Sequence, residues 1–232
     1  DELMRTVPYK MWVSYYLLLL SHQDVHPKTV LDVCCGTGTM CQMLEKEGFK
    51  MSGIDLSPGM IEAAVAKARR RKLDIHYEVA DASTFSLHRK FDAALSFFDS
   101  LNNIVEPEKL QAAFHRVAAH LPPGGSWIFD LNTAYAFSAS LFDQQDLRPN
   151  AKLQYLWEGD YDPATKIITV NMRFWRDDQE FHEIHRQRAY DEEEIREMLE
   201  RAGFSTIRVF HSYTLNPPRH KSDRLHFTAI KA

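Results

Sequence analysis

Three aspartates stand out because each comes at the end of an apolar stretch with the composition of a buried strand. Asp32 closes the stretch that begins at Val30, Asp55 closes residues 51–55, and Asp81 follows residues 75–79. The carboxyl ends of parallel strands meet at one edge of a sheet, where α/β proteins bind ligands. The spacing therefore predicts three carboxylates around one ligand site.

A glycine turn follows the first of these aspartates. Gly36 and Gly38 come after Asp32, and an amphipathic segment from Met40 to Glu47 comes next. Glycine lets a backbone approach a ligand closely and adopt angles that a Cβ forbids. Strand, glycine turn and helix together predict the start of a βαβ unit that binds a nucleotide-like ligand.

The positions of the acids narrow the choice of ligand. Asp55 can accept hydrogen bonds from the two hydroxyls of a ribose, although an acid near a helix N-terminus is the alternative. Asp81 can meet an adenine amino group, or simply belong to a turn. Asp32 would repel a pyrophosphate but suits an ammonium group, so the pattern disfavours a dinucleotide.

Alternating strands and helices must position these residues. The second helix begins after Ser57 at Pro58, a good N-cap followed by a good first residue. A parallel sheet covered on both faces is the expected architecture. The expected strands run through residues 30–33, 51–55, 75–79, 91–97 and 126–131, and the expected helices through 8–22, 40–47, 58–72 and from 107 onward.

The pattern changes after residue 150. Three consecutive strands are expected at 153–158, 166–175 and 180–190, with turns at 162–165 and 177–179. They predict an antiparallel β-meander. A helix over 191–202 and two strands at 206–212 and 224–230 complete the chain.

The ordered motifs resemble those of class I S-adenosylmethionine-dependent methyltransferases. They are Leu31 to Gly38, Gly53 to Met60, and Ala80-Asp81-Ala82, within a likeness that covers about residues 5–135. The resemblance implies a Rossmann-like seven-stranded sheet in the order 3-2-1-4-5-7-6, with an antiparallel seventh strand. One departure is Cys34, which occupies the position of the family's first glycine.

A narrower resemblance concerns the acceptor. Phe97 to Asn102 after the fourth strand, and Pro8-Tyr9 with Trp12, are similar to bacterial small-molecule N-methyltransferases. It implies one domain over residues 1–232, with 151–190 inserted as a meander that covers the active site. Methyl transfer to a nitrogen or an oxygen of a small molecule is the expected reaction.

The resemblance also implies roles for individual residues. Expected contacts of the cofactor are Tyr9, Trp12, Asp32, Cys34, Gly36, Gly38, Asp55, Leu56, Met60, Asp81, Ala82 and Phe97. Candidate catalytic residues are Asp99, His185 and Tyr190, and candidate substrate residues are Asn102, Trp157 and Arg188. A packed or solvated role is the alternative for each aromatic and strand residue, and an amine acceptor needs no strong base.

Composition limits the partners. A net charge of −4 disfavours nucleic acid, and the basic run 69–72 has the place of a solvated helix end. Methylation of RNA or protein is one alternative function, motivated by this basic run and by the last loop's Arg219, His220, Lys221 and Arg224. A non-catalytic module that binds the cofactor is another. Three cysteines without a CxxC pair predict free thiols and no metal, and no apolar run is long enough for a membrane span. We expect a cytoplasmic protein, with a homodimer as a further expectation.

Overall fold

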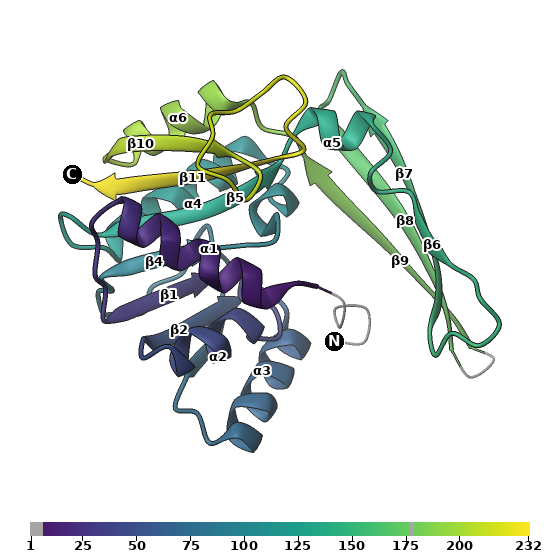
Figure 1. The fold of residues 1–232 in the computed structure, drawn as a ribbon, viewed down its shortest axis with the longest axis horizontal. Coiled ribbons are helices and arrows are strands. Elements are labelled where there is room, and N and C mark those ends of the chain that lie inside the picture. Colours follow the sequence, from purple (N-terminus) through teal and green to yellow (C-terminus); the bar gives the residue numbers. More distant parts are fainter. Residues whose placement is uncertain (1–6, 177–178) are drawn as a thin grey trace.

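The computed structural model describes residues 7–176 and 179–232, and a seven-stranded sheet forms its centre (Figure 1). The strand order is β10-β11-β5-β4-β1-β2-β3, and β11 runs antiparallel to both of its neighbours. The predicted order and the antiparallel seventh strand are confirmed. The strands are β1 (Thr29–Val33), β2 (Lys50–Asp55), β3 (His76–Val79), β4 (Ala93–Ser96), β5 (Ser126–Asn132), β10 (Phe204–His211) and β11 (Arg224–Lys231).

Helices cover both faces of this sheet, because side chains along its central strands alternate between two apolar clusters. On β5, Trp127 and Phe129 belong to one cluster and Ile128 to the other. The first cluster includes α4 and α6, and the second includes α1, α2 and α3. The helices are α1 (Tyr9–His22), α2 (Thr39–Lys46), α3 (Pro58–Arg71), α4 (Pro107–Ala119) and α6 (Glu192–Arg201).

Local sequence signals set the start and end of α3, the helix after the second aspartate. The Ser57 side chain accepts a hydrogen bond from the Met60 amide, and Pro58 takes the first helical position. Lys72 ends the helix in the left-handed conformation, φ 56°. The predicted basic run therefore lies at a helix C-terminus, where cations are favourable.

A second sheet of four antiparallel strands, the meander sheet, lies beside the first (Figure 1). It contains β6 (Gln144–Asp146), β7 (Gln154–Asp162), β8 (Ile167–Arg176) and β9 (Gln179–Arg188). The three predicted meander strands are confirmed, whereas β6, the short helix α5 (Ala134–Ser138) and the 3₁₀ turn η2 (Ser100–Asn103) were not predicted. Positions 177 and 178 of the predicted turn lie outside the described residues.

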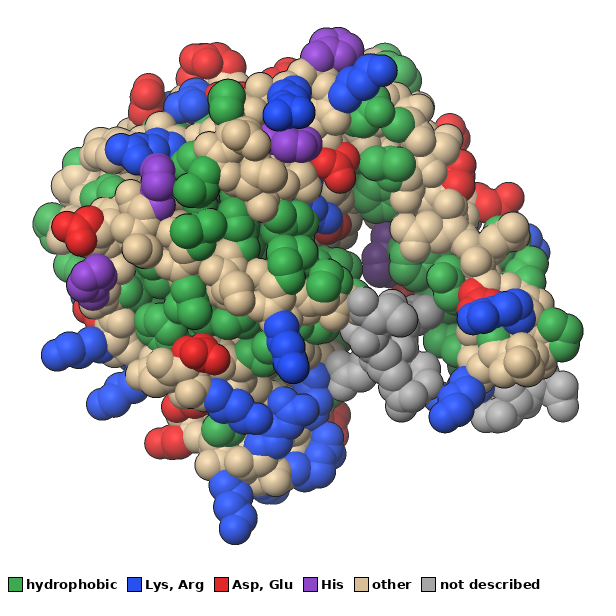
Figure 2. All heavy atoms as spheres, in the orientation of Figure 1, with side chains coloured by type: hydrophobic (Ala, Val, Ile, Leu, Met, Phe, Trp, Pro, Cys, Tyr) green, Lys and Arg blue, Asp and Glu red, His purple; other side chains and the backbone are tan. Residues whose placement is uncertain are grey.

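The meander sheet packs against α5 through one of its two faces. Ala136 and Phe137 of α5 form a small apolar cluster with Ile168 and Val170 of β8. Figure 2 shows an opening between the meander sheet and the body built on the seven-stranded sheet. Among the described residues, no helix has the length and apolar character required to cross a bilayer.

Candidate active site

The predicted cofactor residues outside α1 lie where β1, β2, β3 and β4 end, at the edge of the sheet where its parallel strands terminate. The chain order reverses between β1 and β4, which are neighbours in the sheet. Open α/β sheets bind their ligands at such a switch point. The edge therefore combines the glycine turn, the aspartates and the segment from Phe97 to Asn102.

The glycine turn is held by Asp55 of the neighbouring strand. The Asp55 carboxylate accepts hydrogen bonds from the amides of Gly36 (2.8 Å) and Ser57 (2.9 Å). Cys34 has a left-handed φ of 65°, a conformation that favours glycine. Although Cys34 replaces a glycine of the family pattern, its backbone therefore keeps the conformation of a glycine turn.

The two glycines of the turn face different surroundings. A Cβ added at Gly36 would meet no atom within 4 Å, whereas one at Gly38 would lie 2.4 Å from the Tyr77 hydroxyl. Both residues have positive φ, 55° and 72°. Close packing against Tyr77 therefore requires a glycine at position 38, whereas the space beside Gly36 at the strand edge is open.

Asp32 lies beneath the turn and is almost fully buried, at 3% exposure. Burial raises its pKa to about 7, while the hydrogen bond from the Cys41 thiol (3.3 Å) acts in the opposite direction. A buried carboxylate has lost its hydration, and a cationic partner beside it would offset that desolvation cost.

The region after β2 and β3 presents apolar and polar groups side by side. Leu56 and Met60 are 67% and 45% exposed. The Asp81 carboxylate accepts hydrogen bonds from the amide (2.7 Å) and hydroxyl (2.6 Å) of Ser83, and these bonds lower its pKa. Ala82 is buried beside it. Exposed apolar side chains after β2, with an ionised carboxylate after the neighbouring strand β3, suit a ring with a polar edge.

Aromatic side chains close the other side of the strand edge. The ring of Trp12 lies 5.2 Å from Tyr9, 5.0 Å from Phe98 and 6.1 Å from Tyr213. Phe97 is buried at the end of β4. The predicted residues of α1 therefore meet the β4 end, in packing contacts that include Tyr213, which was not predicted.

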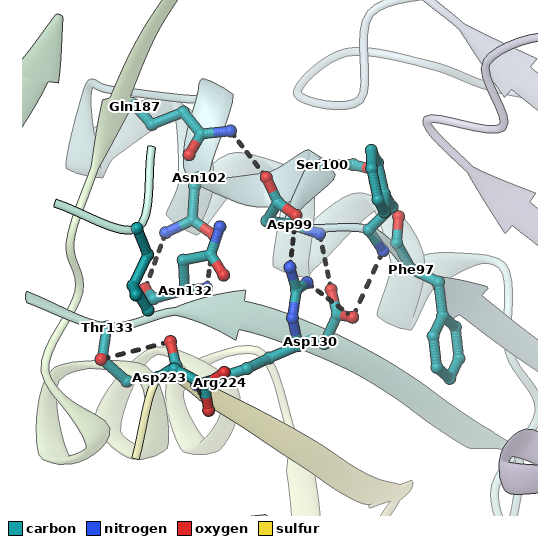
Figure 3. Close-up of polar contacts among 12 residues, drawn as sticks. Phe97, Asp99, Ser100, Asn102, Asp130, Asn132, Thr133, Gln187, Asp223 and Arg224 are labelled. Atoms are coloured by element: carbon teal, nitrogen blue, oxygen red, sulfur yellow. Dashed lines mark hydrogen bonds and ion pairs between the residues drawn. The ribbon is translucent and has the colours of Figure 1, made fainter. Parts of the chain in front are cut away.

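A buried polar cluster surrounds Asp99, directly after Phe98 (Figure 3). Arg224 bonds the Asp99 carboxylate at 2.7 Å and pairs with Asp130 at 2.9 Å. Gln187 of β9 donates its side-chain amide to the other Asp99 oxygen at 2.7 Å. His226 lies 3.7 Å from Asp130, and burial lowers its pKa well below the usual range, so the ring is neutral.

No sequence pattern predicts Asp130, Gln187 and His226 as site residues, and by its place in the sequence Arg224 resembles a surface cation. Arg224 is instead buried in ion pairs, so it does not support RNA binding. One signal was present in the sequence: Asp130 interrupts the apolar run from Trp127 to Leu131. A charge inside a buried strand needs a partner, which Arg224 supplies.

Asn102 and Tyr190, two predicted site residues, are engaged with the backbone. The Asn102 side chain donates to the carbonyls of Asn132 (3.1 Å) and Arg188 (2.8 Å) and accepts from the Asn132 amide (2.9 Å). The Tyr190 hydroxyl donates to the carbonyl of Ile104, and its ring belongs to the apolar core. These contacts favour structural roles that join β9 to the seven-stranded sheet.

The register of the meander divides its predicted residues between two faces. His185 lies on the same face of β9 as Gln187, and Trp157 lies on that face of β7. His185 pairs with Glu183 at 3.0 Å, so a carboxylate orients its ring. Arg188 lies on the opposite face, 3.6 Å from Glu194. His185 and Trp157, but not Arg188, share the face that contacts Asp99 through Gln187.

Comparisons with known proteins agree with this geometry. A family model described as a methyltransferase domain matches residues 30–125. A protein of Geobacillus sp. (strain WCH70) that is named as a methyltransferase is 29% identical, over 100% of this chain and 96% of its own length. The crystal structure of an S-adenosylmethionine-dependent methyltransferase from Clostridium acetobutylicum ATCC 824 superposes with a TM-score of 0.89 at 26% identity, over 100% and 96% of the two chains.

A third relative is 39% identical, over 46% of this chain and 44% of its own length. It is the dTDP-3-amino-3,4,6-trideoxy-alpha-D-glucopyranose N,N-dimethyltransferase of Streptomyces venezuelae. Residues 30–125 match a methyltransferase domain, and together with the fold and the strand-edge motifs these matches support the predicted S-adenosylmethionine-dependent methyltransferase.

Proposed function

We propose that this enzyme methylates a nitrogen atom of a small-molecule amine, held between the β4 end and the meander sheet. The observation that carries this proposal is the charge of the buried cluster. Asp99 and Asp130 provide two carboxylates against one guanidinium, and His226 is neutral. An excess negative charge in a buried position favours a cationic amine over a neutral hydroxyl.

The cofactor side of the proposal uses the predicted residues. Asp32 would hold the methionyl ammonium, Asp55 the ribose, and Asp81 with Ala82 the polar edge of adenine. The open Cβ direction at Gly36 fits a ligand that passes close to the backbone. Met60 and Leu56 are exposed and would pack on the adenine ring. Cys34 and Phe97 would line the space beside the sulfonium.

S-adenosylmethionine, when bound, supplies a methyl group on a positively charged sulfur. The chain's own contribution is alignment and exclusion of water, effects worth about 7–11 kcal/mol in favourable cases. Asp99 would orient the acceptor nitrogen. His185, held by Glu183, would take the proton that the bound ammonium must lose before its nitrogen lone pair attacks the methyl group.

The meander sheet would cover the acceptor in this proposal. Trp157, His185 and Gln187 share one face of this sheet, and Gln187 already contacts Asp99. The amino-sugar dimethyltransferase relative supports an acceptor of similar chemistry, although that match covers less than half of each chain. Covering the site would keep bulk water from the reacting groups.

Two measurements test the proposal. Calorimetric titration with S-adenosylhomocysteine tests the cofactor site, and no binding at high micromolar concentration would contradict it. A screen for release of S-adenosylhomocysteine then tests the acceptor class, with glycine, ethanolamine, D-glucosamine and a dTDP-linked 3-amino sugar as amines. Glycolate, ethylene glycol and D-glucose serve as hydroxyl counterparts. Mass spectrometry should find an N-methylated product, and O-methylation alone would overturn the assignment to nitrogen.

A further inference from the structure

Two consecutive non-glycine residues at the β4 end adopt left-handed backbone conformations. Phe98 has φ 68° and Asp99 has φ 47°. Such conformations are unfavourable for residues with a Cβ and persist only where the surrounding structure enforces them. Something must therefore hold this segment in place.

Asp130 supplies the restraint from the neighbouring strand. Its carboxylate accepts hydrogen bonds from the amides of Phe98 (3.3 Å) and Asp99 (2.6 Å), and the residue has no exposed surface. Both amides of this left-handed segment therefore point at one carboxylate. Asp130 thus fixes the backbone from which the Asp99 side chain projects.

Arg224 and Gln187 fix the side chain itself. Arg224 bridges Asp99 and Asp130, and its side chain is only 14% exposed. It binds one Asp99 oxygen, and Gln187 donates to the other. An arginine suits this position because its planar, permanently charged guanidinium can bridge two carboxylates.

The Asp99 carboxylate still has hydrogen-bonding capacity. A carboxylate offers about four lone-pair sites, and these two contacts use one on each oxygen. The Asp99 side chain retains 10% exposure. Arg224 and Gln187 therefore restrict the directions from which the Asp99 carboxylate can accept a further hydrogen bond. They do not occupy all of its lone-pair sites.

We propose that Asp130, Arg224 and Gln187 are positioning residues, which fix the Asp99 carboxylate so that it directs the nitrogen of an amine acceptor. This inference rests on the proposed function and adds the residues that set its acceptor geometry. Because Gln187 belongs to β9, the meander sheet takes part in orienting Asp99 as well as covering it. The acceptor site is thus assembled from four strands: the end of β4, and β5, β9 and β11.

The test measures equilibrium binding of an amine, so it does not depend on turnover alone. D-glucosamine and the dTDP-linked 3-amino sugar are each titrated into the complex with S-adenosylhomocysteine, where no methyl group can be transferred. For the amine that binds the wild type more tightly, Arg224→Gln should weaken binding at least about tenfold, because loss of the fixed Asp99 direction outweighs the added negative charge. The S-adenosylhomocysteine affinity should stay within about twofold of wild type. Gln187→Leu should weaken amine binding by a smaller factor, about three- to tenfold.

Conservative and control variants separate positioning from general structural damage. Arg224→Lys keeps the charge but not the planar bridge, so it should recover part of the amine affinity. Arg219→Gln alters an exposed side chain in the same β10–β11 connection and should leave both affinities unchanged. In turnover, the positioning variants should raise the KM of the amine more than they lower kcat.

Each outcome has a defined meaning. If Arg224→Gln fails to fold, as judged by thermal unfolding, Gln187→Leu carries the test. Unchanged amine affinity and KM in the folded variants would overturn the inference while leaving the proposed function intact. Absence of amine binding and amine turnover by the wild type would overturn the proposed function, and this inference with it.

Discussion

The cofactor side and the acceptor side of the site differ in how far apart in the sequence their hydrogen-bonded residues lie. On the cofactor side, hydrogen bonds join residues 9 positions apart (Asp32 with Cys41) and 19 apart (Asp55 with Gly36). Around Asp99 on the acceptor side, the bonds span 31 positions to Asp130, 88 to Gln187 and 125 to Arg224. The part of the cofactor side from Asp32 to Met60 lies in two successive strand–helix units, whereas the acceptor side exists only after the whole chain has folded.

This difference has a functional consequence. A locally built cofactor site can be retained while distant strands change, so acceptor chemistry can vary without loss of the cofactor. If the two sides are separable, a variant on one side should leave the function of the other unchanged.

Asp55→Ala should damage the cofactor side most. It removes the carboxylate that holds the Gly36 and Ser57 amides and that would bind the ribose. Loss of two charge-assisted hydrogen bonds predicts a decrease in S-adenosylhomocysteine affinity of about 10²- to 10⁴-fold. Calorimetric titration measures this, with the exposed Asp74→Ala as control; retained affinity would show that Asp55 does not organise the site.

His185→Ala should damage only the acceptor side. If His185 accepts the proton of the amine, kcat should fall about 10²-fold while S-adenosylhomocysteine affinity is unchanged. His182→Ala is the matched control, because His182 lies on the opposite face of the same strand and is exposed. Steady-state kinetics compare the two, and equal activities would remove His185 from the mechanism.

Gly38→Ala and Gly36→Ala should separate stability from binding within the cofactor side. At Gly38 the new methyl would meet the Tyr77 hydroxyl in addition to the left-handed strain, so the free energy of unfolding should fall by about 2–3 kcal/mol. At Gly36 the methyl would project into open space, so stability should fall by only about 1 kcal/mol while cofactor affinity decreases. Denaturant unfolding and calorimetry measure the two quantities, and a reversed order would contradict the packing described for Tyr77.

Asp32 should make both binding and stability depend on pH. Its pKa is raised from 3.8 to about 7, so it is protonated below about pH 7 and then offers no charge to an ammonium. S-adenosylhomocysteine affinity should therefore decrease as pH falls below about 7, by at most about tenfold per pH unit. Titrations across pH 5.5–8 test this, and Asp32→Asn should remove the dependence.

The stability effect of Asp32 has the opposite direction. Between about pH 4 and 7 the unfolded chain releases a proton that the folded protein keeps, so stability of the ligand-free protein should fall as pH rises through this window. The slope should be on the order of 1 kcal/mol per pH unit. Unfolding at several pH values, compared with Asp32→Asn, would detect it; identical slopes in the two proteins would show that Asp32 is already ionised.

The sequence predicted most of the fold because its signals are local. Alternating apolar strands, the Ser57-Pro58 helix start and the glycine turn each depend on neighbours within a few residues. The family resemblance then supplied the strand order, which local patterns do not contain. The sequence missed β6, α5 and η2, which are short and lack a clear period.

The candidate site divides in the same way. Asp32, Asp55 and Asp81 were identifiable because each ends an apolar stretch, and the structure brings them to one sheet edge. In the sequence, by contrast, Arg224 resembles one more exposed cation, because it follows a basic loop. Only the sheet register brings it to Asp130 and Asp99. Likewise, nothing in the sequence near Gln187 indicated that it would meet Asp99.

The sequence by itself therefore determined the class of enzyme and the residues expected to hold its cofactor, because strand–turn–helix units carry their ligand-binding groups within short segments. Tertiary structure alone decided how Asp99 is held and which meander residues face it. The reason is physical: a buried ion pair and a cross-sheet hydrogen bond depend on strand register and sheet order. Neither is encoded in the spacing of the residues that form them.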